Sequence, residues 1–454
     1  MSLLKTPAAW PTILLEHAPT GEEPFAGLRR AVRELGPAGT IAEVAASGLR
    51  GRGGGGYPTG EKWRAAAAAA TVPGAKTPAV VVNAYGADPT SLTDRTLVAE
   101  NATAVVEGAA IAAWAIGAEE AVIAVRTGET AAIAALEAAI AAAHAAGVLG
   151  LDPAGIASLA GHRPGSARRL EIEVRTVQGA YMLGEETVLI KALEGKRGQP
   201  EQRPPHPTED GLWGAPTVVQ NAQTAAAVAW ILRHSAEGFR SVGTAEEPGT
   251  ILVDVRGPAG AGVAEVPFGT TLRDIVKLVG GAGAAHQVKA VLVGGPSGGI
   301  LPADQLSTPY TYQALRAAGA HVGSGSIVIA DERACVVDLA RLLTRFCADE
   351  ACGKTIPCRI GTRRLAEIGE RLSAGTSRAR DLDLLVDLAD DIIGSALCDH
   401  ERLATLPLTS GLRYFRPELD AHLERGECPA GVCHPIALAG AAPAAPATTT
   451  TSAA

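Results

Sequence analysis

Residues 47–63 of the chain read Ser47-Gly48-Leu49-Arg50-Gly51-Arg52-Gly53-Gly54-Gly55-Gly56-Tyr57-Pro58-Thr59-Gly60-Glu61-Lys62-Trp63. Glycine adopts backbone conformations that other residues avoid, so successive amide groups of such a loop can converge on one anion. A glycine run alone is often only a flexible loop, but this one also carries the cations Arg50, Arg52 and Lys62. We therefore predict that the loop binds a phosphate group.

The loop matches neither of the two common nucleotide-binding motifs. It lacks the Gly-Lys-Ser/Thr ending of a P-loop, and its glycines do not follow a clear strand, as the dinucleotide-binding fingerprint requires. The phosphate prediction therefore depends on the glycines and cations themselves.

The composition around this loop is that of an ordinary globular protein. The chain has 454 residues, enough for about three domains of roughly 150 residues each. Hydrophobic residues make up 47% and charged residues 19%, which excludes a largely disordered or fibrous chain. The net charge of -8 argues against a nucleic-acid partner or an anionic-membrane surface, because both require a basic face.

The sequence predicts a cytoplasmic chain without a membrane span. The first residues lack the basic region, apolar stretch and cleavage site of a signal peptide. The longest uncharged stretch, residues 211–232, contains Pro216, Gln220, Asn221 and Gln223, which a single membrane-spanning helix would not tolerate.

The pattern of apolar residues changes twice along the chain. Residues 41–193 alternate between helix-like and strand-like segments, which indicates an α/β layout, and residues 250–330 indicate a small α+β unit. From Arg333 onward the spacing is helical. The individual elements expected are strands at 80–82, 121–125, 251–255 and 263–266, and helices at 130–146 with a threonine cap, after the cap Thr271, and at 382–393. Residues from Ala437 onward, rich in Ala, Pro and Thr, are predicted to be disordered.

The cysteines are confined to the last third of the chain. They are Cys335, Cys347, Cys352, Cys358, Cys398, Cys428 and Cys433. Because disulfides are rare in cytoplasmic proteins, this clustering indicates a metal centre.

The glycine loop closely resembles the flavin loop of a known family, the NADH-binding FMN flavoprotein subunits of respiratory complex I and of NAD-linked hydrogenase and formate dehydrogenase diaphorases. Further segments agree with that family. They are residues 179–187, 193–200 and 211–217, and, resembling its β-grasp domain, 263–272 and 294–299. The resemblance extends from about Leu28 to Phe415.

The resemblance implies an α/β architecture of successive domains: a Rossmann-like FMN-binding domain, a β-grasp (ubiquitin-like) domain and a C-terminal helical bundle that carries the cysteines. The implied boundaries are 1–249 for the FMN- and NADH-binding domain, 250–332 for the β-grasp (SLBB-like) domain, 333–425 for the helical iron–sulfur domain, and 426–454 for a cysteine pair and a disordered tail.

The resemblance also implies the cofactor contacts. The residues that match the family's FMN contacts are Gly51, Arg52, Gly53, Lys62, Asn83, Tyr181, Gly184, Glu185, Glu186 and Asn221, with Arg203 keeping a positive charge nearby. Amides and Lys62 suit the phosphate, while amide and carboxylate side chains suit the ribityl hydroxyls and the flavin ring. Glu185 and Asp88 are the residues expected to act in catalysis.

The sequence departs from the family near the nicotinamide. Tyr85 and Gly86 stand where relatives have an acidic pair, and Asp88 replaces a glutamate. The positions that sandwich NADH between aromatic rings in relatives hold Tyr57, Ala65 and His206 here. Loss of an aromatic contact costs on the order of 1 kcal/mol, so NADH binding is expected to be weaker, redirected or absent.

The family's [4Fe-4S] motif is incomplete. Cys352, Cys358 and Cys398 match three of its ligands, but Thr355 occupies the second position. Since thiolates are the ligands that such clusters select, a four-iron cluster with a foreign ligand, a [3Fe-4S] cluster and no cluster all remain open. Cys347 could substitute only if a helix end unwinds, and Cys335 is expected to be a small buried hydrophobe.

The pair Cys428 and Cys433 resembles the segment that leads into a ferredoxin-like domain in hydrogenase-linked relatives. As a zinc site the pair lacks a convincing fourth ligand, so a remnant without metal is expected.

These features predict an FMN-dependent electron-transfer subunit that oxidises NADH and passes electrons to a small [2Fe-2S] or ferredoxin-like subunit. The alternative is a divergent relative that keeps FMN, has lost NADH binding and relays electrons between protein partners. A scaffold that has lost both centres is the third possibility, and the intact glycine loop argues against it.

Overall fold

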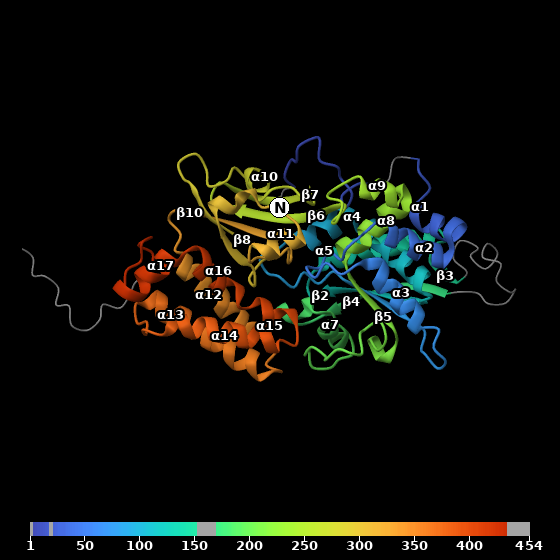
Figure 1. Ribbon diagram of the computed structural model, residues 1–454. Coiled ribbons are helices and arrows are strands. Elements are labelled where there is room, and N and C mark those ends of the chain that lie inside the picture. The colour runs from blue at the N-terminus through green and yellow to red at the C-terminus, as the bar shows by residue number, and fades with distance from the viewer. Residues whose placement is uncertain (1–2, 18–20, 152–168, 434–454) are drawn as a thin grey trace, which may run out of the picture.

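The computed structural model describes residues 3–17, 21–151 and 169–433, which form a mixed α/β protein with two five-stranded sheets. Figure 1 shows the N-terminal helices, in blue, at one end of the molecule and the C-terminal helices, in orange and red, at the other. The predicted tail beyond Ala437 lies outside the described residues.

The first sheet is parallel except at one edge. Its strand order is β3-β4-β2-β1-β5, and only β3 runs antiparallel to its neighbour. The strands are β1 (Ala79–Asn83), β2 (Glu120–Arg126), β3 (Gly150–Leu151), β4 (Arg169–Val177) and β5 (Thr217–Asn221). Asn83 and Asn221 are register partners at the carboxyl ends of β1 and β5. Ligands of open parallel sheets bind outside this edge.

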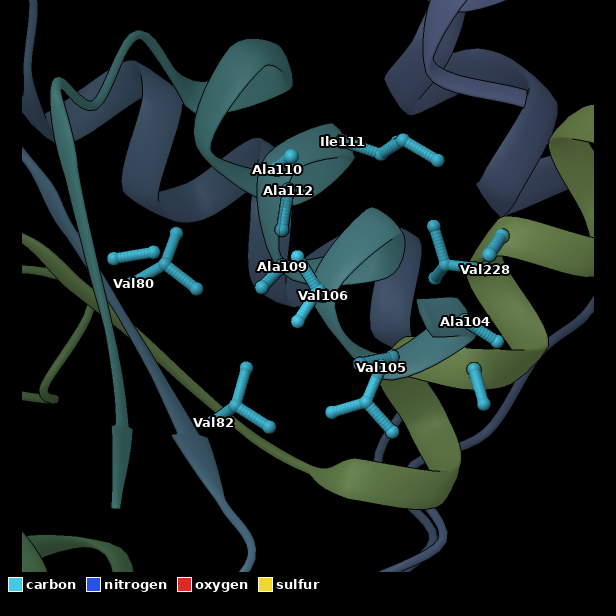
Figure 2. Close-up of a cluster of buried hydrophobic side chains, with 14 of the residues drawn as sticks. Val80, Val82, Ala104, Val105, Val106, Ala109, Ala110, Ile111, Ala112 and Val228 are labelled. Atoms are coloured by element: carbon cyan, nitrogen blue, oxygen red, sulfur yellow. The ribbon is translucent and has the colours of Figure 1, made fainter. Parts of the chain in front are cut away.

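Small side chains bring the helices of this half close together. Figure 2 shows Val80 and Val82 of β1 on one side of the alanine-rich helix α4 and Val228 of α8 on the other. A Cβ at Gly108 would lie 1.9 Å from the carbonyl oxygen of Ala225, so the crossing of the two helices requires glycine there. The helices are α1 (Ala26–Arg30), α2 (Gly36–Ala46), α3 (Thr59–Ala69), α4 (Thr93–Ile116), α5 (Thr130–Ala145), α7 (Glu186–Leu193), α8 (Ala222–His234) and α9 (Ala236–Arg240).

The helix predicted over 130–146 exists as α5, but its threonine cap is wrong. The residue before the helix is Glu129, and no side chain caps the helix start. Thr130 is instead the first helical residue. The high helix propensity of the alanine run forms this helix without a cap.

The glycine-rich loop leads into a helix and does not follow a strand, as predicted. The amide of Gly51 donates to the carbonyl of Tyr57 at 2.8 Å, and the amide of Thr59 donates to Leu49 at 2.9 Å. These two bonds close the base of the loop just before α3 begins.

The second sheet is mixed, with the order β7-β6-β10-β8-β9. Its strands are β6 (Thr250–Gly257), β7 (Gly260–Pro267), β8 (Val288–Val293), β9 (Gly299–Pro302) and β10 (Ser326–Asp331), and its helices are α10 (Leu272–Lys277) and α11 (Tyr312–Ala317). The predicted pairing of 251–255 with 263–266 is confirmed as the antiparallel β6–β7 hairpin. The Thr271 cap is confirmed as well, since its hydroxyl accepts from the amide of Asp274.

Six α-helices follow β10 in the described part of the chain. They are α12 (Val336–Glu350), α13 (Thr362–Ala374), α14 (Asp381–Ser395), α15 (Asp399–Leu403), α16 (Leu406–Tyr414) and α17 (Arg416–Asp420). They share a core with β8 and β9 of the second sheet. No helix within the described ranges is both long and apolar enough to cross a bilayer.

Candidate functional site: a cavity shared by three parts of the chain

A cavity of about 1400 Å³ opens at the carboxyl edge of the first sheet. All residues predicted to bind cofactor or act in catalysis line it: Gly51, Arg52, Gly53, Lys62, Asn83, Asp88, Tyr181, Gly184, Glu185, Glu186, Arg203 and Asn221. Ligand pockets usually measure roughly 300–1,000 Å³. The cavity therefore has room for a flavin nucleotide together with part of a second nucleotide.

The glycine loop forms one wall of the cavity. Its consecutive glycines, Gly53 to Gly56, carry no side chains, so the backbone itself lines the cavity there. Gly54 and Gly56 have φ angles of 97° and 65°, which favour glycine. A Cβ at Gly54 would lie 3.1 Å from the carbonyl oxygen of Gly323, in the segment that leads into β10 of the second sheet. At this point the backbone of the loop packs directly against the backbone of Gly323. No side chain of the glycines fills the cavity, which leaves it open for a ligand.

Arg52 is held in place by the protein's own carbonyl groups. Its three guanidinium nitrogens donate to the carbonyl oxygens of Arg50, Pro248 and Thr250 at 2.8–3.0 Å, and its amide donates to Thr224. The side chain is 2% exposed, and burial lowers its pKa to about 10. These bonds join the loop to the start of β6, and the phosphate contact expected of Arg52 stays a prediction.

Two cations and two carboxylates meet at the start of α7. Lys62 Nζ lies 2.7 Å from Glu186 Oε2, and an Arg203 nitrogen lies 3.0 Å from Glu186 and 2.6 Å from Glu185. Burial alone would raise the pKa of Glu186, but Lys62 and Arg203 lower it by more, so the net shift is downward. Glu185 also caps α7, accepting from the amides of Thr187 and Val188 at 2.8 and 2.9 Å.

The two asparagines at the strand ends are held by the protein. Asn83 donates to the carbonyl of Leu183 at 3.0 Å, and Asn221 donates to Asp94 at 2.9 Å while capping α8. Burial raises the pKa of Asp94, and the bonds from Gln223 and Asn221 oppose that rise. These hydrogen bonds fix the side-chain amides of Asn83 and Asn221 where they line the cavity.

Three polar atoms on the cavity wall are buried without a partner among the described residues. They are Gln220 Nε2, Thr59 Oγ1 and His400 Nδ1. Buried polar groups are nearly always hydrogen-bonded, so these atoms indicate a polar ligand. Gln220 is fixed from its other side, because its Oε1 accepts from the indole of Trp63 at 3.2 Å. The donors and acceptors present fit a flavin nucleotide.

The second sheet supplies residues that the sequence analysis did not single out. Asp88 accepts from the amide and hydroxyl of Thr90, each at 2.7 Å, and from the hydroxyl of Ser324. Tyr181 shares a 2.9 Å bond with Ser297, and both line the cavity. Burial raises the pKa of Asp88, and these hydrogen bonds oppose it. Ser297 lies in the segment 294–299, and the resemblance of that segment to the family's β-grasp domain is the sequence signal that could have indicated it.

The positions that depart from the family differ in where they point. Tyr57, which is 55% exposed, Ala65 and His206 all line the cavity. Tyr85 does not; it is buried, with the guanidinium of Arg126 4.6 Å from its ring centre. Tyr85 therefore contributes no side chain to the cavity wall.

The three predicted cluster ligands lie beside the cavity. Burial raises the pKa of Cys358 to about 12, and Glu401 and the neighbouring thiols add to the rise. Burial also raises the pKa of Cys398 to about 11, although a hydrogen bond from the backbone of Glu401 opposes that rise. The hydroxyl of Thr355 donates to Glu401 at 2.7 Å. Directly after Cys398, α15 contributes Asp399, His400 and Leu403 to the cavity wall.

The other cysteines confirm one prediction and correct another. Cys335 and His422 lie with Cys428 and Cys433, and their ligand atoms are all within 4.8 Å of one another. Cys335 is a buried member of the C-terminal core, as predicted, but the Cys428–Cys433 pair does not lack further ligands, because Cys335 and His422 lie beside it. Sequence spacing could not reveal this, because Cys335 precedes His422 by 87 residues.

Comparison with known proteins identifies the family of the chain. Residues 44–230 match the family model described as Nuo51 FMN-binding domain, and residues 338–422 match the NADH-ubiquinone oxidoreductase-F iron-sulfur binding region. The NADH-quinone oxidoreductase F subunit of Mycobacterium tuberculosis is 39% identical over 394 residues, covering 87% of this chain and 86% of that protein. The chain therefore belongs to the family of NADH-quinone oxidoreductase F subunits, the flavoprotein subunits predicted from its sequence.

Relatives of two further kinds are similar over most of the chain. NADP-reducing hydrogenase subunit HndC of Solidesulfovibrio fructosivorans is 38% identical over 90% of this chain and 81% of its own length. An NAD+-reducing [NiFe]-hydrogenase in the H2-reduced state has a TM-score of 0.76 and 32% identity, over 90% of this chain and 67% of that one. The predicted NADH dehydrogenase class and the FMN and iron–sulfur cofactors agree with these matches.

Proposed function

We propose that this chain takes a hydride from NADH at a bound FMN and passes the electrons singly through an iron–sulfur centre to a small [2Fe-2S] or ferredoxin-like subunit. The cavity is the main observation that supports the proposal, because the residues predicted to contact FMN and those predicted to contact NADH all line it. Helix α15, which directly follows Cys398, also forms part of the cavity wall. FMN supplies the conversion from two-electron to one-electron chemistry.

The chain's own residues would divide the work of binding. Lys62 and the amides of the glycine loop would hold the phosphate, and the free Nε2 of Gln220 would donate to the flavin or its ribityl chain. Glu185 and Asp88, the two expected catalytic residues, would act as positioning groups. Glu185 orients Arg203 at the start of α7, and Asp88 ties the segment beside the nicotinamide position to Ser324.

Cys352, Cys358 and Cys398 would hold the cluster with three thiolates. The hydroxyl of Thr355 is bound to Glu401, a carboxylate buried beside these cysteines. Since a hydroxyl is a poor iron ligand, a [3Fe-4S] cluster or a [4Fe-4S] cluster with an oxygen ligand at the fourth iron fits this set of donors.

We also propose the predicted division into a Rossmann-like domain (1–249), a β-grasp domain (250–332), a helical iron–sulfur domain (333–425) and a terminal segment (426–454). Three observations support this division. The first sheet is mostly parallel, the second sheet has the β6–β7 hairpin at one edge, and helices α12 to α17 follow the second sheet along the chain.

The test is an anaerobic absorbance titration of the purified chain with NADH, with FMN and iron quantified on the same sample. Stoichiometric NADH is expected to bleach the bound flavin. Flavin that dithionite reduces and NADH does not would contradict NADH oxidation and support the alternative, a relay that keeps FMN without NADH. Two observations favour that alternative. Ala65 lines the cavity at a position where the resemblance implies an aromatic ring, and Tyr85 is buried away from the cavity.

A further inference from the structure

A second set of metal-ligating side chains lies away from the cavity, at the far end of the C-terminal helices. Cys335 precedes α12, His422 lies in the π-helical turn Ala421–Arg425 after α17, and Cys428 and Cys433 follow that turn. Figure 1 shows α12 and α17 within the orange and red group of helices. None of these four residues belongs to the cluster motif or lines the cavity.

The distances between these side chains match a single tetrahedral ion. Cys335 Sγ lies 3.6 Å from His422 Nε2 and 3.6 Å from Cys433 Sγ. With zinc–sulfur bonds of about 2.3 Å, two ligand atoms of a tetrahedral site lie about 3.8 Å apart. A disulfide would need its sulfurs at about 2.05 Å, and the structure records all these cysteines as free.

Three of the four ligands are oriented for metal binding by a neighbouring backbone group. His422 Nδ1 lies 2.9 Å from the carbonyl oxygen of Glu418, which places the proton on Nδ1 and leaves Nε2 as the donor atom. The amide of Asp338 points at Cys335 Sγ at 3.4 Å, and the amide of Cys433 points at Cys428 Sγ at 3.5 Å. Amide donors and a helix N-terminus stabilise thiolates.

We propose that Cys335, His422, Cys428 and Cys433 bind one structural Zn²⁺. Three thiolates and one imidazole form a closed four-coordinate site, the type that zinc occupies in structural centres, and it leaves no position for a substrate. Binding releases the three thiol protons to solvent and involves no change of oxidation state. The ion joins residues 428–433, which contain no helix or strand, to the start of α12.

This inference does not depend on the proposed NADH oxidation. Zinc binding and flavin reduction are measured separately, so failure of one leaves the other intact. The first measurement is zinc and iron per chain, by elemental mass spectrometry, on the full-length protein purified anaerobically. We expect one zinc per chain.

Cys433→Ser is the main variant because Cys433 is only partly buried, so its replacement disturbs the core least. We expect its zinc content to fall at least tenfold while iron is unchanged. Cys347→Ser is the matched control: Cys347 is a buried cysteine of α12 that donates to the carbonyl of Pro296, outside the zinc ligands. That variant should keep its zinc.

Two further measurements keep the proposal open to refutation if a variant folds poorly. Cobalt added to the metal-free wild-type chain should give the absorption of a tetrahedral thiolate complex. Cys398→Ser should retain zinc, because it changes only the iron–sulfur motif. Zinc lost in Cys398→Ser but kept in Cys433→Ser, or a disulfide between two of the four residues, would overturn the proposal.

Discussion

Arg50 and Arg52 stand two positions apart in one loop, and their side chains have different roles. Arg52 is buried and donates to Pro248 and Thr250, across the junction between the loop and β6. Arg50 reaches the carbonyl oxygens of Gly56 and Glu246 at the molecular surface, at 3.1 and 3.4 Å. Arg52 thus supports the junction with buried hydrogen bonds, whereas Arg50 reaches across it only with an exposed one.

Arg52→Gln should lower the free energy of unfolding by about 2–4 kcal/mol, because it leaves buried carbonyl oxygens without donors. Arg50→Gln should cost less than about 1 kcal/mol, since water can replace its bonds. Urea denaturation of both variants checks this. Equal losses would show that the buried bonds of Arg52 do not hold the junction.

Glu186→Gln should destabilise the protein by about 1–3 kcal/mol at pH 7, because Lys62 and Arg203 lose a shared counterion. The pKa of Glu186 is lowered on folding, so its contribution is complete above the unfolded pKa of about 4.3 and declines as pH falls through the folded value. Thermal unfolding at several pH values should therefore show a constant gap from pH 7 to about pH 5.5. A gap that closes within that interval would contradict the downward shift.

At the scale of elements, strands and helices were predictable where apolar periodicity is strong. β1, β2, the β6–β7 hairpin and α5 lie where the sequence places them. The α5 cap failed because propensity alone forms that helix. The buried role of Arg52 could not be read either, because its acceptors are carbonyl oxygens of Pro248 and Thr250, about 200 residues further along the chain. The cavity residues within 294–324 could not be predicted for the same reason, because they reach the cavity only through the packing of the second sheet against the first.

The glycine loop provides a matched pair of substitutions. Gly54→Ala should cost about 1–3 kcal/mol, because φ is 97° and the new Cβ would press on Gly323. Gly55→Ala should cost little, since its Cβ would meet nothing within 4 Å. Denaturation of the flavin-free variants separates them, and a larger loss in Gly55→Ala would contradict the loop geometry.

Thr355→Cys should complete the four-cysteine motif and raise the iron content to that of a [4Fe-4S] cluster. Iron analysis and electron paramagnetic resonance of the oxidised and reduced chain check it. Thr355→Ser, which keeps the hydroxyl beside Glu401, is the control and should match the wild type. Unchanged iron in Thr355→Cys would mean that position 355 does not face the cluster.

At the scale of the whole molecule, the cavity belongs to no single part. Its wall combines the glycine loop, Gly323 and Ser324 before β10, and His400 in α15. Glu247 adds a further link, since its carboxylate accepts from the amides of Tyr312 and Gln313 at 2.7 and 3.2 Å. A ligand in the cavity therefore contacts all three parts at once.

Hydrogen exchange should report this sharing. FMN is expected to slow amide exchange in residues 51–56, 321–324 and 399–403 together, because binding to the folded state stabilises every segment that contacts the ligand. The end of α13 and the loop after it, which lie outside the cavity, serve as the internal control. Protection confined to residues 51–56 would contradict a three-part site.

The shared wall also has a consequence for biosynthesis. When the glycine loop leaves the ribosome, Gly323 has yet to be synthesised, and His400 follows later still. A nascent chain holding only the first sheet has one side of the cavity and exposes the rest to water. We expect flavin to be acquired by the released polypeptide, so the supply of free FMN matters after translation rather than during it.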